Sequence, residues 1–151
     1  MYGAGVKANF VSMARWISRG VPLPLGGITS NRRSFSALAN LVDLIVARSE
    51  KDEAVGQKVL VSDREDLSTA ELLRRNSREF AIAPRLVPIP AFALALSARL
   101  LGRQDLWQRI GGTLQVDSAP TRQRLHWTPP VSVDEGLRVA VASLAAVQRA
   151  R

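Results

Sequence analysis

Val59-Leu-Val-Ser-Asp-Arg-Glu-Asp-Leu-Ser-Thr69-Ala-Glu71 is the stretch that decides the fold. Its first residues are aliphatic, and they predict a short strand, Gln57 to Val61, of the kind that is buried on both faces. A charged turn, Asp63 to Asp66, follows. Ser68-Thr-Ala-Glu71 then has the spacing of a capping box, whose side chains bond the free N–H groups at a helix start. The box predicts a helix that ends near Phe80, and strands alternating with helices are typical of an α/β protein.

The segments before this stretch alternate between helical and extended patterns. Apolar residues at helical spacing predict a helix from Ala8 to Arg19. Two prolines make Val21 to Leu25 an extended segment, and Thr29 to Arg33 is a polar loop after a glycine pair. A further helix is expected from Leu41 to Ser49, with Asn40 as its N-cap.

The segments after it contain a second capping box, Ser132-Val-Asp-Glu135, which predicts a final helix that reaches about Ala150. Trp127, between a helical turn and two prolines, is expected to anchor a core. The other expected elements are a strand at Arg85 to Ile89, a helix from Ala91 to Ile110 that breaks near Gly102, an extended piece at Thr113 to Val116 and a helical turn at Thr121 to Leu125. So few short strands indicate a thin sheet that is part of something larger.

The composition limits the chemistry. The chain has 151 residues, of which 46% are hydrophobic, so one ordinary domain with a real core is expected. Its formal net charge is +8, and most of its cations are arginines, which favours anionic partners. A genome's base usage would explain the arginine bias equally well. There is no cysteine and a single histidine, His126. Disulfides, thiol catalysis and a histidine-rich metal site are therefore excluded, and no metal is expected.

No membrane partner is expected either. The longest uncharged run, Leu86 to Ala98, is well short of the roughly 20 residues that a membrane span needs. The start of the chain lacks the charged-then-apolar pattern of a secretory signal. These two observations favour a cytoplasmic protein.

Three local patterns suggest chemistry, and each has a structural alternative. Gly3-Ala-Gly5-Val-Lys-Ala8 matches the dinucleotide pattern G-x-G-x-x-A. No full strand precedes it, however, and the stretch from Val21 to Phe35 contains no acid that could hold a ribose, so a glycine turn is the better interpretation. Asn31-Arg32-Arg33-Ser34 could clamp a diphosphate through forked hydrogen bonds, or it could be a solvated basic loop. His126 could be a general base, although a structural or surface role is favoured.

Four segments, taken in order, resemble the C-terminal half of the extended short-chain dehydrogenases that act on nucleotide sugars. They are Tyr2-Gly-Ala-Gly5, Arg33-Ser-Phe-Ser-Ala-Leu-Ala-Asn40, Val59 to Thr69, and Asp117 to Leu137. The resemblance covers nearly the whole chain, and the ordered set is more specific than any one motif. It is strongest to bacterial UDP-glucose 4-epimerase-like enzymes of surface-polysaccharide synthesis and to 4-keto-sugar reductases.

This resemblance implies both a fold and a site. Residues 1–151 would form part of a substrate domain of α/β class, with few short strands and several helices, without the Rossmann half that holds the cofactor. That substrate domain binds a UDP-sugar in the family. The residues that match its substrate-binding positions are Asn9 and Phe10 at the start of a helix, Pro24 and Leu25 along the base, Arg33 on the phosphates and, more loosely, Arg109 as a second phosphate-binding arginine.

The chain also departs from the family pattern. The glycine-rich cofactor loop and the catalytic Y-x-x-x-K pair are absent, since Tyr2 is the only tyrosine and Val6 stands four residues beyond it. Pro120 and His126 replace a lysine and a glycine that are not catalytic. We therefore expect no catalytic residue here, and no turnover or binding of NAD(P), the cofactor of the full-length family, by this chain alone.

Two further expectations concern partners. The strand at Gln57 to Val61 would lack its outer neighbours, so either self-association through an exposed sheet edge or partial unfolding is predicted. The alternative function is a basic nucleic-acid or protein interaction module. It is the weaker hypothesis, because aromatic residues are only 5% of the chain and the three tryptophans occupy helical or packing positions, so no specific nucleic-acid partner is expected.

Overall fold

The structure is a computed structural model that describes residues 1–3, 16–17, 19–49 and 58–149. The helix expected from Ala8 to Arg19 lies almost wholly outside the described residues, although residues 16 and 17 are helical. The chain divides into two compact units, which are described separately. Unit 1 comprises Met1–Val11, Ser34–Asp66 and Gln115–Arg151, and unit 2 comprises Ser12–Arg33 and Leu67–Leu114.

Helices dominate both units, and the strands are short. In unit 1 the helices are α2 (Leu38–Ser49), α6 (Ala119–Leu125) and α7 (Val133–Arg149). In unit 2 they are α3 (Thr69–Glu79), α4 (Ala91–Leu100) and α5 (Gln104–Gly111). The strands β1 (Arg33–Ser34) and β2 (Asp66–Leu67) pair in a two-stranded sheet. An α/β fold with few short strands and several helices is therefore confirmed. In the described part of the chain, no helix is both long and apolar enough to cross a membrane.

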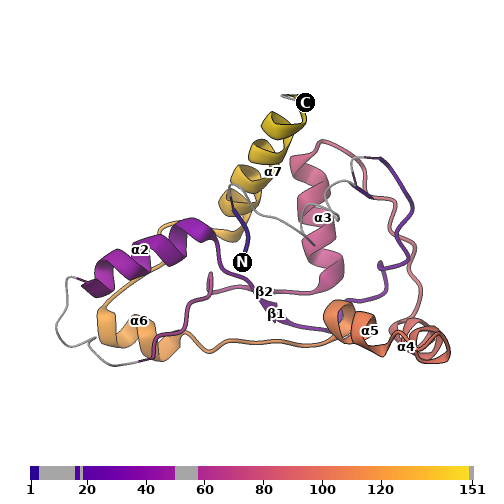
Figure 1. The fold of residues 1–151 in the computed structure, drawn as a ribbon, viewed down its shortest axis with the longest axis horizontal. Coiled ribbons are helices and arrows are strands. Elements are labelled where there is room, and N and C mark those ends of the chain that lie inside the picture. Colours follow the sequence, from indigo (N-terminus) through magenta and orange to yellow (C-terminus); the bar gives the residue numbers. More distant parts are fainter. Residues whose placement is uncertain (4–15, 18, 50–57, 150–151) are drawn as a thin grey trace. The chain divides into compact units, whose positions relative to one another are not determined.

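The apolar core of unit 1 lies where α2 and α6 run side by side (Figure 1). Leu44 of α2, Leu125 of α6 and Trp127 are buried against one another. The indole Nε1 of Trp127 donates a hydrogen bond to a carboxylate oxygen of Asp43, at 2.6 Å. The prediction that Trp127 anchors a core is therefore confirmed. His126, which precedes it, is exposed and ends α6 in the left-handed conformation at φ 46°, which is a structural role.

A buried polar cluster around Asp63 also stabilises unit 1. Its carboxylate accepts hydrogen bonds from the Tyr2 hydroxyl at 2.5 Å, from the Ala37 backbone N–H at 2.9 Å and from the Asn40 side chain at 2.7 Å. The amide of Asn40 also bonds both the N–H and the C=O of Val131. The predicted N-cap role of Asn40 is therefore wrong. The helix begins two residues earlier, at Leu38, and the Asn40 oxygen accepts the N–H of the distant Val131 rather than an N–H of the helix.

The strand predicted at Gln57 to Val61 is also wrong for the residues that are described, because 58–63 adopt no regular structure. The backbone N–H of Leu60 donates to the Thr121 hydroxyl at 3.0 Å, and the Ser62 and Ser118 hydroxyls bond at 2.7 Å. A strand exists only if another strand supplies its backbone hydrogen-bond partners, and here the Leu60 N–H bonds a side chain of α6, while the Ser62 side chain bonds the N-cap of that helix. The exposed sheet edge expected at this segment is therefore not a feature of the described residues.

Large apolar side chains are instead exposed on helices. Among those with half or more of their surface in contact with solvent are Val42, Ile45 and Val46 on α2, and Phe92, Leu96 and Leu100 on α4. Residues 42, 45 and 46 share one face of α2, and 92, 96 and 100 share one face of α4. Helix faces of this kind are more apolar than a typical solvated helix surface.

The helix starts and the helix break predicted from local sequence are confirmed in both units. Ser68 and Glu71 form the predicted capping box at the start of α3, with both reciprocal hydrogen bonds present. The second box, Ser132 with Glu135, is also present, at the start of α7 in unit 1. The predicted break near Gly102 lies between α4 and α5, which are adjacent in Figure 1, and its positive φ of 64° suits glycine.

The two extended segments of unit 2 pair with each other in parallel. The Leu23 N–H donates to the Arg85 carbonyl and the Val87 N–H donates to the Leu23 carbonyl, each at 2.9 Å. These contacts are isolated bridges rather than strands. A Cβ on Gly27 would lie 2.1 Å from the Ile89 carbonyl oxygen, so only glycine allows the two segments to approach this closely. The segments rest on a core of Ile17, Leu23 and Leu73.

Tyr2 supplies a direct test of the buried cluster in unit 1. Burial, followed by the hydrogen bond from its hydroxyl to Asp63 and the charges of nearby carboxylates, raises the pKa of Tyr2 above its usual range. The folded state therefore holds the neutral phenol. Its contribution to stability is complete below the unfolded pKa of about 10 and is lost as the pH rises above that value.

Because Tyr2 is the only tyrosine, the tyrosinate absorbance of the whole protein monitors this one group. We predict that the native protein gains no tyrosinate signal at the pH where the urea-unfolded protein titrates, and that the signal appears only when alkaline unfolding occurs, as followed by circular dichroism. Tyr2→Phe should lack the tyrosinate signal. Its free energy of unfolding should also fall less than that of the native protein as the pH rises above about 10. A folded protein that titrates near pH 10 would contradict the buried cluster.

Candidate anion-binding site

Unit 2 contains an open hollow of about 560 Å³. Most of its lining comes from α5 and from the segment that follows this helix, and one residue comes from β1. The lining residues are Arg33, Asp105, Gln108, Arg109, Gly112, Thr113 and Leu114. The hollow therefore combines two guanidinium groups with a carboxylate, an amide and a hydroxyl.

The spacing of its polar residues places α5 along the hollow. Asp105, Gln108 and Arg109 lie three and four residues apart, which brings their side chains to one face of the helix. The helix ends at Gly111, and its C-cap Gly112 turns to the extended conformation and donates its N–H to the Gln108 carbonyl at 3.1 Å. A Cβ on Gly112 would lie 2.3 Å from that carbonyl oxygen. The tight turn that brings Thr113 to the hollow therefore requires glycine.

Backbone hydrogen bonds place Arg33 beside this turn. The Leu114 N–H donates to the Arg32 carbonyl at 2.9 Å, and Arg33 forms a parallel bridge with Leu114. The Arg33 guanidinium then reaches back to α5 and donates through Nη1 to the carbonyl oxygen of Arg109. Since a guanidinium carries five N–H groups in a planar fork, this bond orients the side chain and leaves donors for a ligand.

Arg32 points elsewhere. Its Nη1 lies 3.4 Å from Glu71 Oε2, in an ion pair whose two side chains are about half exposed. The pKa of Glu71 is lowered chiefly by hydrogen bonds from the backbone and side chain of Ser68, and less by the charge of Arg32. An exposed pair of this kind contributes at most about 1 kcal/mol. The two neighbouring arginines therefore differ in environment, because alternate residues of an extended segment face opposite ways.

The structure brings together two of the residues predicted for substrate binding, Arg33 and Arg109. Pro24 is exposed and does not line the hollow, and Leu25 packs against the core of unit 2. Asn9 and Phe10 lie outside the described residues.

Sequence reasoning did not assign Asp105, Gln108, Gly112 or Thr113 to the site. The helical spacing of Asp105 and Gln108, followed by the glycine pair at 111–112, is a signal that could have suggested Asp105, Gln108 and Gly112. Nothing local marked Thr113, because its position depends on the turn at Gly112 and on the Arg32 N–H, which donates to its hydroxyl at 3.3 Å.

Two of the predicted chemical features can be compared with the described residues, the glycine pattern at its first residue and the absence of a metal site. Gly3, the first glycine of the G-x-G-x-x-A pattern, is buried, and a Cβ there would lie 2.7 Å from the Cβ of Leu38. The missing side chain thus accommodates α2. Within the described ranges, no group of three or more His, Cys, Asp or Glu residues could hold a metal. The phenol of Tyr2 is buried against Asp63, so it is not available as a catalytic acid or base.

A characterised enzyme has a sequence similar to that of this chain. The chain is 44% identical over 138 residues to UDP-glucose 4-epimerase from Vibrio cholerae, in an alignment that covers 91% of this chain and 42% of that protein. The resemblance inferred from the four sequence segments is confirmed, and the chain spans less than half the length of that relative. No protein-family model matches the chain. No solved structure matches it.

Gly112→Ala tests the turn that shapes the hollow. The added Cβ would overlap the Gln108 carbonyl, so we predict a loss of about 1–3 kcal/mol in unfolding free energy, as for other overpacked sites. The amide of Leu114, bonded to the Arg32 carbonyl, should exchange its hydrogen faster by NMR. Gly102→Ala is the control for lost stability, because its φ of 64° disfavours alanine but the new Cβ meets no atom within 4 Å, so the exchange of Leu114 should increase less than in Gly112→Ala. Equal exchange of Leu114 in both variants would contradict this role of Gly112.

Proposed function

We propose that this chain binds the diphosphate of a nucleotide sugar in the hollow of unit 2. The observation that carries the proposal is the convergence of Arg33 and Arg109. These arginines are separated by 76 residues in sequence, yet one guanidinium bonds the backbone of the other residue and both line the same hollow. Arginine forks match the geometry of phosphate oxygens, and their bonds to a charged group are among the strongest in proteins.

The remaining groups of the hollow suit a ligand that is more than a simple anion. The carboxylate of Asp105 would repel a phosphate, but it can accept hydrogen bonds from the hydroxyls of a sugar or a ribose. Gln108 and Thr113 offer both donors and acceptors. A mixed lining of this kind favours a phosphorylated sugar over a bare polyanion, because both its charges and its hydroxyls would find partners.

The relative supports a more particular ligand. Because the Vibrio cholerae protein is a UDP-glucose 4-epimerase, we propose a UDP-sugar as the ligand, in a protein of epimerase, dehydratase or 4-keto-sugar reductase type that acts in surface-polysaccharide synthesis. In such a protein NAD(P) would supply the redox chemistry. The sequence of this chain contains neither a dinucleotide loop nor a Y-x-x-x-K pair, so its proposed role is substrate binding without turnover.

A second proposal concerns the molecule's surface. The apolar faces of α2 and α4 are exposed, and contact between such faces would remove them from water. We propose that the isolated chain self-associates through these helix faces, in place of the sheet edge that the sequence suggested.

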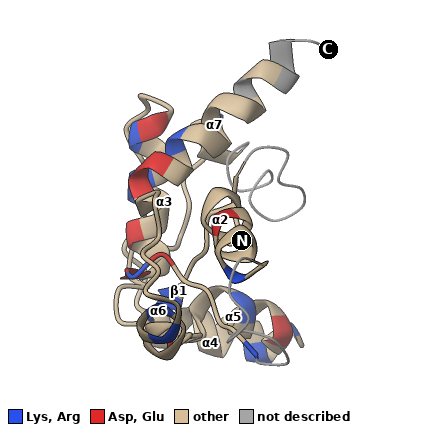
Figure 2. Cartoon of the chain, turned by 90° about the vertical axis from the view of Figure 1, so that its left-hand side faces the viewer, with Lys and Arg blue, Asp and Glu red and all other residues tan. Residues whose placement is uncertain are grey.

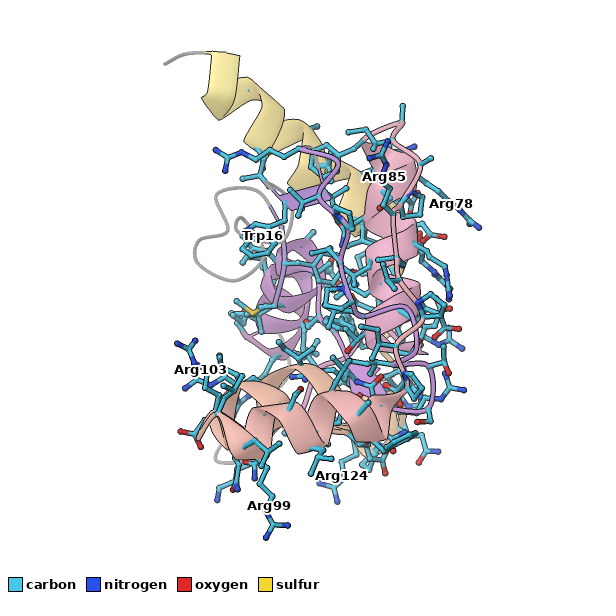
Figure 3. The ribbon with its side chains drawn as sticks, turned by 90° about the vertical axis from the view of Figure 1, so that its right-hand side faces the viewer. Trp16, Arg78, Arg85, Arg99, Arg103 and Arg124 are labelled. Carbon is cyan, nitrogen blue, oxygen red and sulfur yellow. The ribbon has the colours of Figure 1, made fainter. Side chains whose placement is uncertain are left out.

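The alternative class, a basic interaction module for nucleic acid, would use cations outside the hollow. Arg99 and Arg103, at the two sides of the α4–α5 connection, extend away from the ribbon, and Arg78 and Arg85 do so elsewhere in the unit (Figure 3). On α3 and α5, however, acidic residues lie among the basic ones (Figure 2). A mixed distribution supports binding of a small charged ligand better than binding of a polyanion.

The Arg33→Ala variant tests the proposed function. It should weaken UDP binding, measured by calorimetry, by roughly 1.5–3 kcal/mol, the value of a hydrogen bond to a charged group. Arg32→Ala should cost less, because the Arg32 side chain pairs with Glu71. Arg99→Ala is the matched control for net charge, and it should leave the affinity unchanged. Wild-type affinity in Arg33→Ala, or equal losses in all three variants, would remove the basis of the proposal, and equal losses would favour the nucleic-acid alternative.

A further inference from the structure

Asn31 lies two residues before Arg33 and is almost fully buried, with 4% of its surface exposed. Its side chain contacts three separate parts of unit 2. The Oδ1 atom accepts the backbone N–H of Thr69 at 3.0 Å, and Nδ2 lies 3.0 Å from the Thr69 hydroxyl oxygen. The same Nδ2 lies 3.4 Å from the carbonyl oxygens of Ile110 and Gly112. The amide therefore joins the first residue of α3 to the last turn of α5 and to the residue that ends it.

The orientation of this amide is fixed by its partners. Thr69 presents a donor, its backbone N–H, to Oδ1, while Ile110 and Gly112 present only acceptors to Nδ2. The Thr69 hydroxyl donates its own hydrogen to the Ile110 carbonyl at 2.6 Å, so its oxygen is left to accept from Asn31. Reversing the amide would place like groups against each other at every contact.

We propose that Asn31 is a positioning residue for the anion site, and that it sets the register of residues 31–33 against residues 110–114. Arg32 and Arg33 continue the same segment, and both pair with the stretch after α5 through backbone contacts. A slip of one residue would turn the Arg33 side chain away from the hollow, since alternate residues face opposite ways. Its bond to the Arg109 carbonyl would then be lost. The amide of Asn31 prevents that slip because it can satisfy its four contacts in only one register.

This inference rests on the proposed function. It predicts an effect of Asn31 on ligand affinity that an asparagine with only a stabilising role would not have. If Asn31 acts on the ligand only through Arg33, its effect on affinity must disappear once Arg33 is removed. A residue that only stabilises unit 2 would reduce stability in either background and would not change the affinity of the folded protein. The two roles are therefore separable in a double-mutant cycle.

Asn31→Asp is the sharpest substitution, because it keeps the shape and replaces the donor that faces two carbonyl oxygens with an acceptor. We expect UDP affinity, measured by calorimetry, to fall at least about tenfold in this variant. In the Arg33→Ala background the same substitution should cause less than about a twofold further loss. Asn76→Ala is the matched control, since Asn76 is also a fully buried asparagine of unit 2 but bonds only within α3. It should lower the melting temperature and leave the affinity unchanged.

The outcomes distinguish this inference from the proposed function. Wild-type UDP affinity in Arg33→Ala would overturn both. A loss in Arg33→Ala with none in Asn31→Asp, or an equal loss from Asn31→Asp in both backgrounds, would overturn only the inference. If Asn31→Asp does not fold, Thr69→Val and Thr69→Ser take its place. Valine removes the hydroxyl that bridges Asn31 and Ile110, so it should weaken UDP binding at least about tenfold more than serine, and equal affinities would overturn the positioning role.

Discussion

The hydrogen bond from the Arg33 guanidinium to the backbone carbonyl of Arg109 is the contact on which the site depends. Two cations in one hollow repel each other, and neither has a carboxylate partner at salt-bridge distance among the described residues. A carbonyl oxygen is a partial negative charge that neither titrates nor moves. It can hold one guanidinium in place without neutralising it, and the positive potential remains for a ligand. An anion that bridges the two arginines would relieve their repulsion, which is the physical reason for proposing an anionic ligand here.

Each unit is organised around one buried polar side chain with several partners. In unit 1 it is Asp63, which gathers Tyr2, the start of α2 and Asn40. In unit 2 it is Asn31, which gathers the start of α3 and the end of α5. Buried polar groups are costly unless every contact is made, so each cluster favours a single local arrangement over its alternatives. In unit 2 that single arrangement determines which of two adjacent arginines lines the hollow.

The parts of the fold that the sequence predicted correctly depend on short-range signals. Both capping boxes, the break at Gly102 and the anchoring role of Trp127 follow from residues within a few positions of each other. The strand predicted at Gln57 to Val61 is wrong because the Leu60 N–H bonds a side chain 61 residues away in sequence, which local signals do not show. Asn40 failed as a cap for the same reason, because its partners lie on distant segments. The pairing of Arg33 with Arg109 came from the family resemblance, and the rest of the lining depends on how α5 ends.

A titration of the isotope-labelled chain with UDP, followed by NMR, tests the central claim most directly. The account predicts that the largest shifts occur at the backbone amides of Arg33, Gly112, Thr113 and Leu114, with those of α5 next and those of α7 unaffected. The shifts should saturate together, as expected for one site. Shifts that concentrate on unit 1, or that spread over the exposed arginines and vanish with added salt, would contradict the assignment of the hollow as the site that binds a nucleotide sugar.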